Sequence, residues 1–200
     1  MPNNEPLFRG APVPGWEEAR KIASLLVEVA TPRDGYTIDH ALAIAELSRR
    51  VGAEFDLSEG VLEALTLGAL LHDVGKLGVP EAVLEKNGPL TQQEREVIKR
   101  HSDIGARVIE QIWCLRRVAQ VIRHHHERYD GSGYPDGLEA EEIPLPARIV
   151  AAADAYDVMV RSRPYRESRS PTEAIGELMS AAGSQFDAEV VAALIQVAVR

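Results

Sequence analysis

From residue 16 onward, apolar side chains recur at spacings of three and four residues, and this periodicity constrains the fold more than any other feature. Such spacing places the apolar side chains on one face of an α-helix, whereas a half-buried strand needs strict alternation. The sequence contains no convincing alternating run, no internal repeat and no low-complexity tract. We therefore predict an all-α fold, a single bundle of about eight helices.

Prolines, glycines and capping residues divide the periodic pattern into separate helices. Thr91 with Glu94 and Ser170 with Glu173 form capping boxes, and Ser58 and Asp187 are further N-cap residues. The remaining stretch, 127–145, is rich in turn residues and long for a connection, which is typical of functional or disordered loops. Helices are predicted at 16–30, 37–52, 58–76, 80–87, 91–101, 103–112, 115–126 and 146–160, with two more that start near Ser170 and Asp187.

The chain has 200 residues, which is enough for one domain with its own core. Residues 1–15 contain four prolines and are predicted to form a flexible arm, with a single domain at 16–200. The longest apolar stretches, 64–71 and 190–199, are shorter than the roughly 20 residues that a bilayer-spanning helix needs. We expect no membrane segment.

Charge and cysteine content limit the partners and the compartment. The formal net charge of −9 disfavours binding to long nucleic acids, although a small phosphorylated ligand at a local basic patch stays open. Cys114 is the one cysteine and cannot form an internal disulfide, and the first fifteen residues lack an apolar signal segment. Both observations favour a cytoplasmic protein.

Histidines and aspartates fall on the apolar faces of the predicted helices. All six histidines lie between residues 40 and 126, and five of them project inward by helical phase. Asp73 and Asp154 also project inward, and an isolated buried carboxylate is costly unless it is paired or binds a metal. These seven inward residues are His40, His72, Asp73, His101, His125, His126 and Asp154.

The run of three histidines can be sorted by the same geometry, because neighbouring residues on a helix point about 100° apart. His125 follows Val118, Val121 and Ile122 at helical spacing and is the best inward candidate. His126 comes next, and His124 is the outlier.

A metal centre accounts for this pattern better than seven unrelated core residues would. Imidazole and carboxylate ligands without thiolate suit iron or manganese first, with nickel or zinc as alternatives. Seven ligands exceed what one ion accepts, so two divalent ions are expected, with Asp73 as a bridge between them. Two such ions can hold a hydroxide nucleophile and neutralise phosphoryl oxygens.

Basic residues near these ligands are candidates for phosphate binding. Lys76 follows Asp73 by three residues and can contact a phosphate oxygen; the alternative is a solvated lysine near a helix end. The segment 161–169 carries four arginines, which suggests an anion site or a solvated basic loop in equal measure. Turns alone would also explain the glycines of 131–137.

Four segments together resemble an HD-GYP domain: HDVGKLGVP at 72–80, His101, HHERYDGSGYPDGL at 125–138 and ARIVAAADAYDVMVRSRPYR at 147–166. The resemblance covers about residues 36–199. It implies an HD-type metal core and a bacterial phosphodiesterase that converts cyclic di-GMP to pGpG and, in some members, to GMP. The family's metal ligands fall on the same seven residues named above.

The resemblance also implies roles for other residues. The phosphate-contacting lysine falls on Lys76, the signature triplet on Gly133, Tyr134 and Pro135, and a ligand-binding basic pair on Arg163 and Arg166. Some members have a glutamate ligand for a third metal four residues before the first histidine. Tyr36 stands there in this chain, which argues for two ions.

Three functions remain open at this point. The first is hydrolysis of cyclic di-GMP, and the second keeps the chemistry with another substrate, such as cyclic GMP-AMP or a phosphomonoester. The third is a non-catalytic module that senses cyclic di-GMP or docks a diguanylate cyclase or a second copy of the chain. The complete ligand set favours an enzyme over a sensor.

Overall fold

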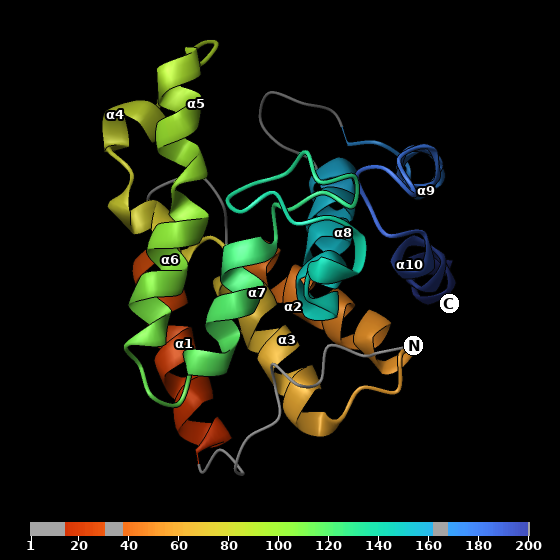
Figure 1. The fold of residues 1–200 in the computed structure, drawn as a ribbon, viewed down its shortest axis with the longest axis horizontal. Helices are drawn as coiled ribbons and strands as arrows, with labels where there is room; N and C mark the ends of the chain where they lie inside the picture. Colours follow the sequence, from red (N-terminus) through yellow and green to blue (C-terminus); the bar gives the residue numbers. More distant parts are fainter. Residues whose placement is uncertain (1–14, 31–37, 162–167, 200) are drawn as a thin grey trace.

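The computed structural model describes residues 15–30, 38–161 and 168–199, which form helices joined by loops (Figure 1). These ranges contain no β-strand beyond two isolated bridges, and none of their helices is long and apolar enough to cross a bilayer. The α-helices are α1 (Trp16–Ala30), α2 (Ile38–Ala53), α3 (Glu59–Leu71), α4 (Glu81–Leu84), α5 (Gln92–Lys99), α6 (His101–Glu110), α7 (Ala119–His124), α8 (Leu145–Val160), α9 (Pro171–Ser180) and α10 (Ala188–Val199). Short 3₁₀ helices are η3 (Val74–Gly78), η4 (Arg116–Val118) and η5 (Ala140–Glu142).

Eight of the described α-helices have eight or more residues, so the prediction of an all-α bundle of about eight helices is confirmed. The capping boxes at Thr91 and Ser170 form, and Asp187 accepts a bond from Glu189 N at 2.8 Å. Ser58 is the N-cap residue of α3, although its side chain makes no capping bond.

Two predicted helices were wrong in extent. The helix predicted at 58–76 ends at Leu71 and is followed by η3, and the one predicted at 115–126 is η4 followed by the shorter α7. The tighter turns of η3 bring Gly75 against α6, where an added Cβ would lie 1.8 Å from the carbonyl oxygen of His101. Only glycine allows this close approach.

Helix α3 contributes buried side chains to two apolar clusters. One cluster joins α2, α3, α8 and α10 and includes Leu65; the other joins α1, α3, α6 and α7 and includes Leu71. Because α3 contributes to both, nearly all of its faces are covered, and its C-terminal end is buried in the middle of the bundle. The residues that follow, His72 and Asp73, are therefore placed at the centre of the molecule.

Candidate metal centre

Four buried imidazoles line the centre, and each is oriented through its Nδ1 atom. In three of them Nδ1 donates to a carbonyl oxygen three residues earlier, at 2.7 Å: His72 to Ala69, His101 to Ile98 and His125 to Ile122. A carbonyl oxygen can only accept, so Nδ1 carries a proton, and whenever the ring is neutral its Nε2 offers a lone pair. This is the arrangement in which histidines bind metal ions.

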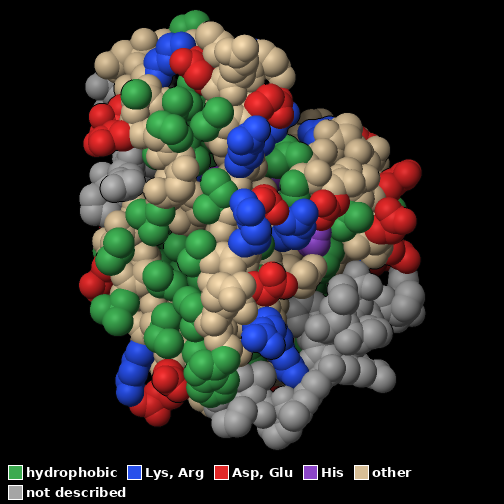
Figure 2. Space-filling view, turned by 60° about the vertical axis from the view of Figure 1, so that its left-hand side comes forward, with side chains coloured by type: hydrophobic (Ala, Val, Ile, Leu, Met, Phe, Trp, Pro, Cys, Tyr) green, Lys and Arg blue, Asp and Glu red, His purple; other side chains and the backbone are tan. Residues whose placement is uncertain are grey.

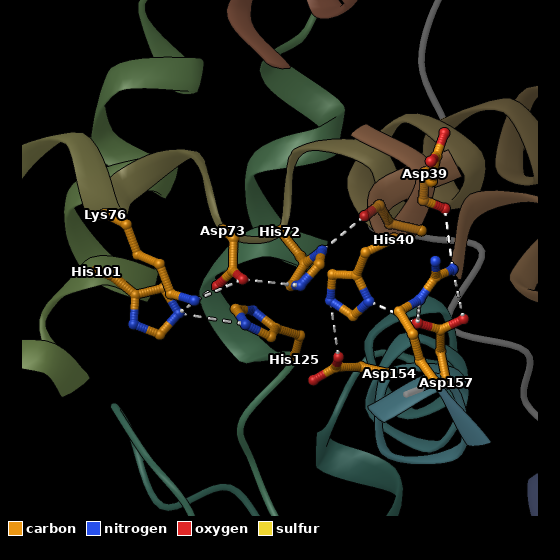
Figure 3. Close-up of polar contacts among 11 residues, drawn as sticks. Asp39, His40, His72, Asp73, Lys76, His101, His125, Asp154 and Asp157 are labelled. Atoms are coloured by element: carbon orange, nitrogen blue, oxygen red, sulfur yellow. Dashed lines mark hydrogen bonds and ion pairs between the residues drawn. The ribbon is translucent and has the colours of Figure 1, made fainter. Parts of the chain in front are cut away.

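The fourth imidazole, His40 of α2, is oriented by a carboxylate instead. Its Nδ1 lies 2.6 Å from Oδ2 of Asp157, and its Nε2 faces Oδ1 of Asp154 at 3.5 Å. Both aspartates lie on α8, one helical turn apart, so α8 holds His40 from two sides (Figure 3). Asp154 thereby joins the centre, as predicted.

Asp73 connects the two halves of the centre. Its Oδ2 lies 3.3 Å from Nε2 of His72, and its Oδ1 lies 3.4 Å from Nε2 of His101 (Figure 3). On the far side, Nε2 of His101 lies 3.4 Å from Nε2 of His125. The two carboxylate oxygens thus face different groups of nitrogen atoms.

Potential ligand atoms gather into three compact groups, each within 4.8 Å. Two of them consist of predicted ligands, His40 with His72 and Asp73, and His101 with His125 and His126; the third, His124 with Glu127 and Asp136, contains none. Imidazole nitrogens and carboxylate oxygens without thiolate suit divalent metal ions of borderline hardness. The residues therefore fit metal ions, and all seven predicted ligands lie in or beside the first two groups.

Burial and charge set the ionisation of these groups. Burial lowers the pKa of His126 to about 3 and holds that of His125 well below its usual value, so both rings are neutral ligands at neutral pH. Burial also lowers the pKa of His72, but the carboxylate of Asp73 outweighs it and raises that pKa to about 9. The same negative charge favours a cation at Nε2 of His72.

Lys76 lies at the edge of the centre. Its Nζ is 2.7 Å from Oδ2 of Asp73, and its side chain is largely buried. Burial opposes ionisation of Asp73, but the positive charges of His72 and Lys76 outweigh it and hold the pKa of Asp73 well below the usual value. Although η3 is not α-helical, the spacing of three residues still places Lys76 on the same side as Asp73, where its ammonium pairs with the carboxylate.

Asp157 is a site residue that the sequence analysis missed. Besides the bond to His40, its carboxylate accepts from Arg161, with Nε at 2.8 Å from Oδ2 and Nη2 at 3.1 Å from Oδ1. Arg161 in turn donates to the carbonyl oxygen of Asp39 at 3.2 Å, which ties the end of α8 to the start of α2. The available signal was the spacing of three residues from Asp154 to Asp157.

Replacing Asp157 by alanine is expected to lower metal affinity about 10- to 100-fold, because such carboxylates orient the ligand and increase its basicity. The measurement is metal binding in competition with a chelator. Replacing Glu17 by alanine is the matched control, since it removes an ion-paired carboxylate from the surface of α1. Equal affinities in the two variants would show that packing alone holds His40 in place.

The predicted loop 127–145 places the triplet Gly133, Tyr134 and Pro135 beside the centre. The ring of Tyr134 stacks on that of His126, with centroids 4.9 Å apart. Gly133 packs so closely on the preceding turn that an added Cβ would lie 2.3 Å from the backbone nitrogen of Arg128. This loop, residues 127–145, is therefore ordered against a predicted metal ligand.

His124 lies outside both groups of predicted ligands, as the helical phase predicts, and belongs to the third group with Glu127 and Asp136. It is nevertheless buried, which helical phase did not predict. Its Nε2 contacts Oδ2 of Asp136 at 3.0 Å. Glu127 fixes the same turn, since its Oε1 accepts from the backbone nitrogens of Asp136 and Gly137 at 2.7 and 3.2 Å. His124 and Glu127 thus hold the loop rather than the centre.

Three residues named from the sequence, Tyr36, Arg163 and Arg166, lie outside the described residues. The roles expected for the two arginines and the expectation drawn from Tyr36 remain predictions.

Comparison with known proteins agrees with this geometry. A family model described as "HD domain" matches residues 18–190, and the chain therefore belongs to the HD domain family. The resemblance drawn from the sequence is confirmed. Relatives include a cyclic di-GMP phosphodiesterase of Thermotoga maritima, which is 39% identical over 90% of this chain and 48% of that protein. The cyclic di-GMP phosphodiesterase response regulator RpfG of Xanthomonas campestris is 40% identical over the same shares.

Other relatives are named for a different substrate. A 3′3′-cGAMP-specific phosphodiesterase of Vibrio cholerae is 39% identical over 80% of this chain and 37% of that protein. The crystal structure of another cyclic GMP-AMP phosphodiesterase of that species superposes with a TM-score of 0.69 and 25% identity, over 89% of this chain and 49% of that one. The chain spans about half the length, or less, of these relatives.

Proposed function

We propose that this chain is a metal-dependent phosphodiesterase that hydrolyses cyclic di-GMP to pGpG. The observation that carries the proposal is the position of Asp73, whose two oxygens face two separate groups of histidine ligands. A pure binding module would not require such a centre. The curated relatives named as cyclic di-GMP phosphodiesterases support this choice of substrate.

The ligand set supports two divalent ions, with iron or manganese favoured and nickel or zinc as alternatives. Asp73 would bridge them, His72 with His40 and Asp154 would hold one, and His101 with His125 and His126 would hold the other. When bound, such ions supply an activated water and neutralise phosphate oxygens.

The residues of the chain position the substrate and exclude water. Lys76 presents an ammonium beside Asp73, where it can contact a non-bridging phosphate oxygen as negative charge develops. The bonds to Nδ1 hold the imidazoles in one orientation, so the site does not have to reorganise during the reaction. Tyr134 covers His126 on the side of the loop 127–145.

The proposal is tested by metal analysis of anaerobically purified protein combined with chromatography of the products from cyclic di-GMP. We expect about two metal ions per chain and release of pGpG, and the chromatogram also shows whether hydrolysis continues to GMP. Absence of any turnover by the metal-loaded protein would favour a sensor or a docking module for a diguanylate cyclase.

A second candidate substrate is cyclic GMP-AMP, because relatives of similar identity carry that name. The two substrates are compared through kcat/KM on the same preparation. A higher value for cyclic GMP-AMP would replace the substrate in this proposal and leave its metal chemistry unchanged.

Replacing Arg163 and Arg166 together by alanine is expected to raise KM for cyclic di-GMP much more than it changes hydrolysis of bis-p-nitrophenyl phosphate. Guanidinium groups can pair with the second phosphate or with a guanine edge, whereas the small diester lacks both. Steady-state kinetics on the two substrates checks this. If both substrates are affected equally, or neither is, these arginines have no role in binding the dinucleotide.

A further inference from the structure

A pocket opens between the loop 127–145 and the helices α5, α6 and α7. It has a volume of about 510 Å³, within the range of small-molecule sites. The molecular surface on this side shows lysine and arginine side chains gathered near the middle, among carboxylates and next to a histidine (Figure 2). The lining residues are Glu96, Lys99, Arg100, Asp103, Arg123, Tyr134 and Pro135.

Tyr134 is shared by the pocket and the metal centre. Its ring stacks on His126, a predicted ligand, and at the same time forms part of the pocket wall. Nζ of Lys99 lies 5.5 Å from the centroid of the ring. The pocket therefore adjoins a predicted metal ligand through the ring of Tyr134.

The basic residues of the pocket differ in how far they are already neutralised. Arg123 is held by two carboxylates, Asp103 and Asp136, and so forms a fixed wall. Lys99 is paired with Glu96 at 2.9 Å. Arg100 is exposed and forms no ion pair within the described part of the chain, so its guanidinium has donors to offer to a ligand.

A cyclic dinucleotide has two phosphates, of which one is attacked at a time. We propose that this pocket binds the purine of the nucleotide whose phosphate is not attacked, and that Arg100 recognises guanine there. The proposal rests on the proposed function, since it assigns a subsite for a cyclic dinucleotide. Guanine presents two acceptors, O6 and N7, on one edge, and an arginine fork can donate to both. Adenine presents a donor beside N7 and cannot pair in this way.

The other lining residues suit a base in the same position. Glu96 and Asp103 place carboxylates in the pocket that can accept from the N–H groups of guanine. Pro135 and the ring of Tyr134 offer apolar surface to a planar ring. Acceptors, donors and an apolar wall together fit a purine better than a bare phosphate, for which the two carboxylates would be repulsive.

The test replaces Arg100 by alanine and by lysine, with Arg95→Ala as the matched control. Arg95 is an exposed arginine of α5 whose side chain donates to Leu90 O and Gln92, and it does not line the pocket. KM and kcat are measured for cyclic di-GMP and for bis-p-nitrophenyl phosphate, and thermal unfolding checks that each variant folds.

We expect Arg100→Ala to raise KM for cyclic di-GMP about tenfold or more, the scale of one lost bidentate contact, with unchanged hydrolysis of the small diester. Arg100→Lys should restore little, because a lysine lacks the fork. The control should resemble the wild type. The recognition of guanine by Arg100 would be overturned if KM were unchanged in Arg100→Ala or fully recovered in Arg100→Lys. Cleavage of cyclic di-GMP by the wild type would still uphold the proposed function.

Failure of the proposed function gives a different result. If the wild type does not cleave cyclic di-GMP, the dinucleotide stays intact and its affinity is measured by titration. If only Arg100→Ala then binds cyclic di-GMP more weakly, the proposed guanine site in the pocket is supported and the proposed phosphodiesterase activity is rejected. No binding by the wild type would overturn both.

Discussion

Replacing Asp73 by alanine is expected to empty the metal centre, whereas replacing His124 by alanine leaves the metal content near the wild-type level. The two oxygens of Asp73 face different groups of ligands, so its loss removes a contact from both metal positions at once. It also leaves the remaining imidazoles without the central negative charge that favours a cation.

His124 is a demanding control because it is a buried histidine next to two of the predicted ligands in the sequence. Its contacts are with Gln120 O and Asp136, outside both groups of predicted ligands. Metal content is measured per chain by elemental analysis. If His124→Ala lost its metal and Asp73→Ala kept it, the assignment of the centre would be wrong.

The same measurement tests the number of ions. Two ions per chain are expected, since Tyr36 stands where some HD-GYP proteins supply a glutamate for a third. A reproducible third metal would show that this position does not limit the centre.

Replacing Lys76 by alanine is expected to keep the metal ions and to lower phosphodiesterase activity about 10²-fold or more. This is the scale seen when one preorganised electrostatic contact to a transition state is removed. Nζ of Lys76 lies 2.7 Å from Oδ2 of Asp73 but cannot itself be a ligand, because an ammonium has no lone pair to donate.

Lys86→Ala is the control for this variant. Lys86 forms an ion pair with Glu94 at 2.6 Å and lies outside both ligand groups. Activity and metal content are measured on the same samples, so that a loss of activity through loss of metal is recognised at once. Unchanged turnover in Lys76→Ala would mean that Lys76 only neutralises Asp73.

Helical periodicity was sufficient to predict most of the fold and the composition of the centre. The spacing of apolar residues around His40, His72, His101 and His125 predicts that these side chains face inward, and all four are buried. This works because helical phase fixes the direction of a side chain relative to its own helix. The capping boxes at Thr91 and Ser170 succeed for a similar reason, since they involve residues only three apart.

Phase alone does not determine which residues of different helices meet. Three such contacts depend on how the helices pack. His40 pairs with Asp157 across 117 positions, Asp73 faces His101, and Tyr134 covers His126. The close approach of Gly75 to His101 of α6 likewise joins residues that are 26 positions apart. The sequence by itself therefore determined the helices and the types of ligand, whereas tertiary structure alone decided how the ligands are grouped, because packing between distant segments fixes those distances.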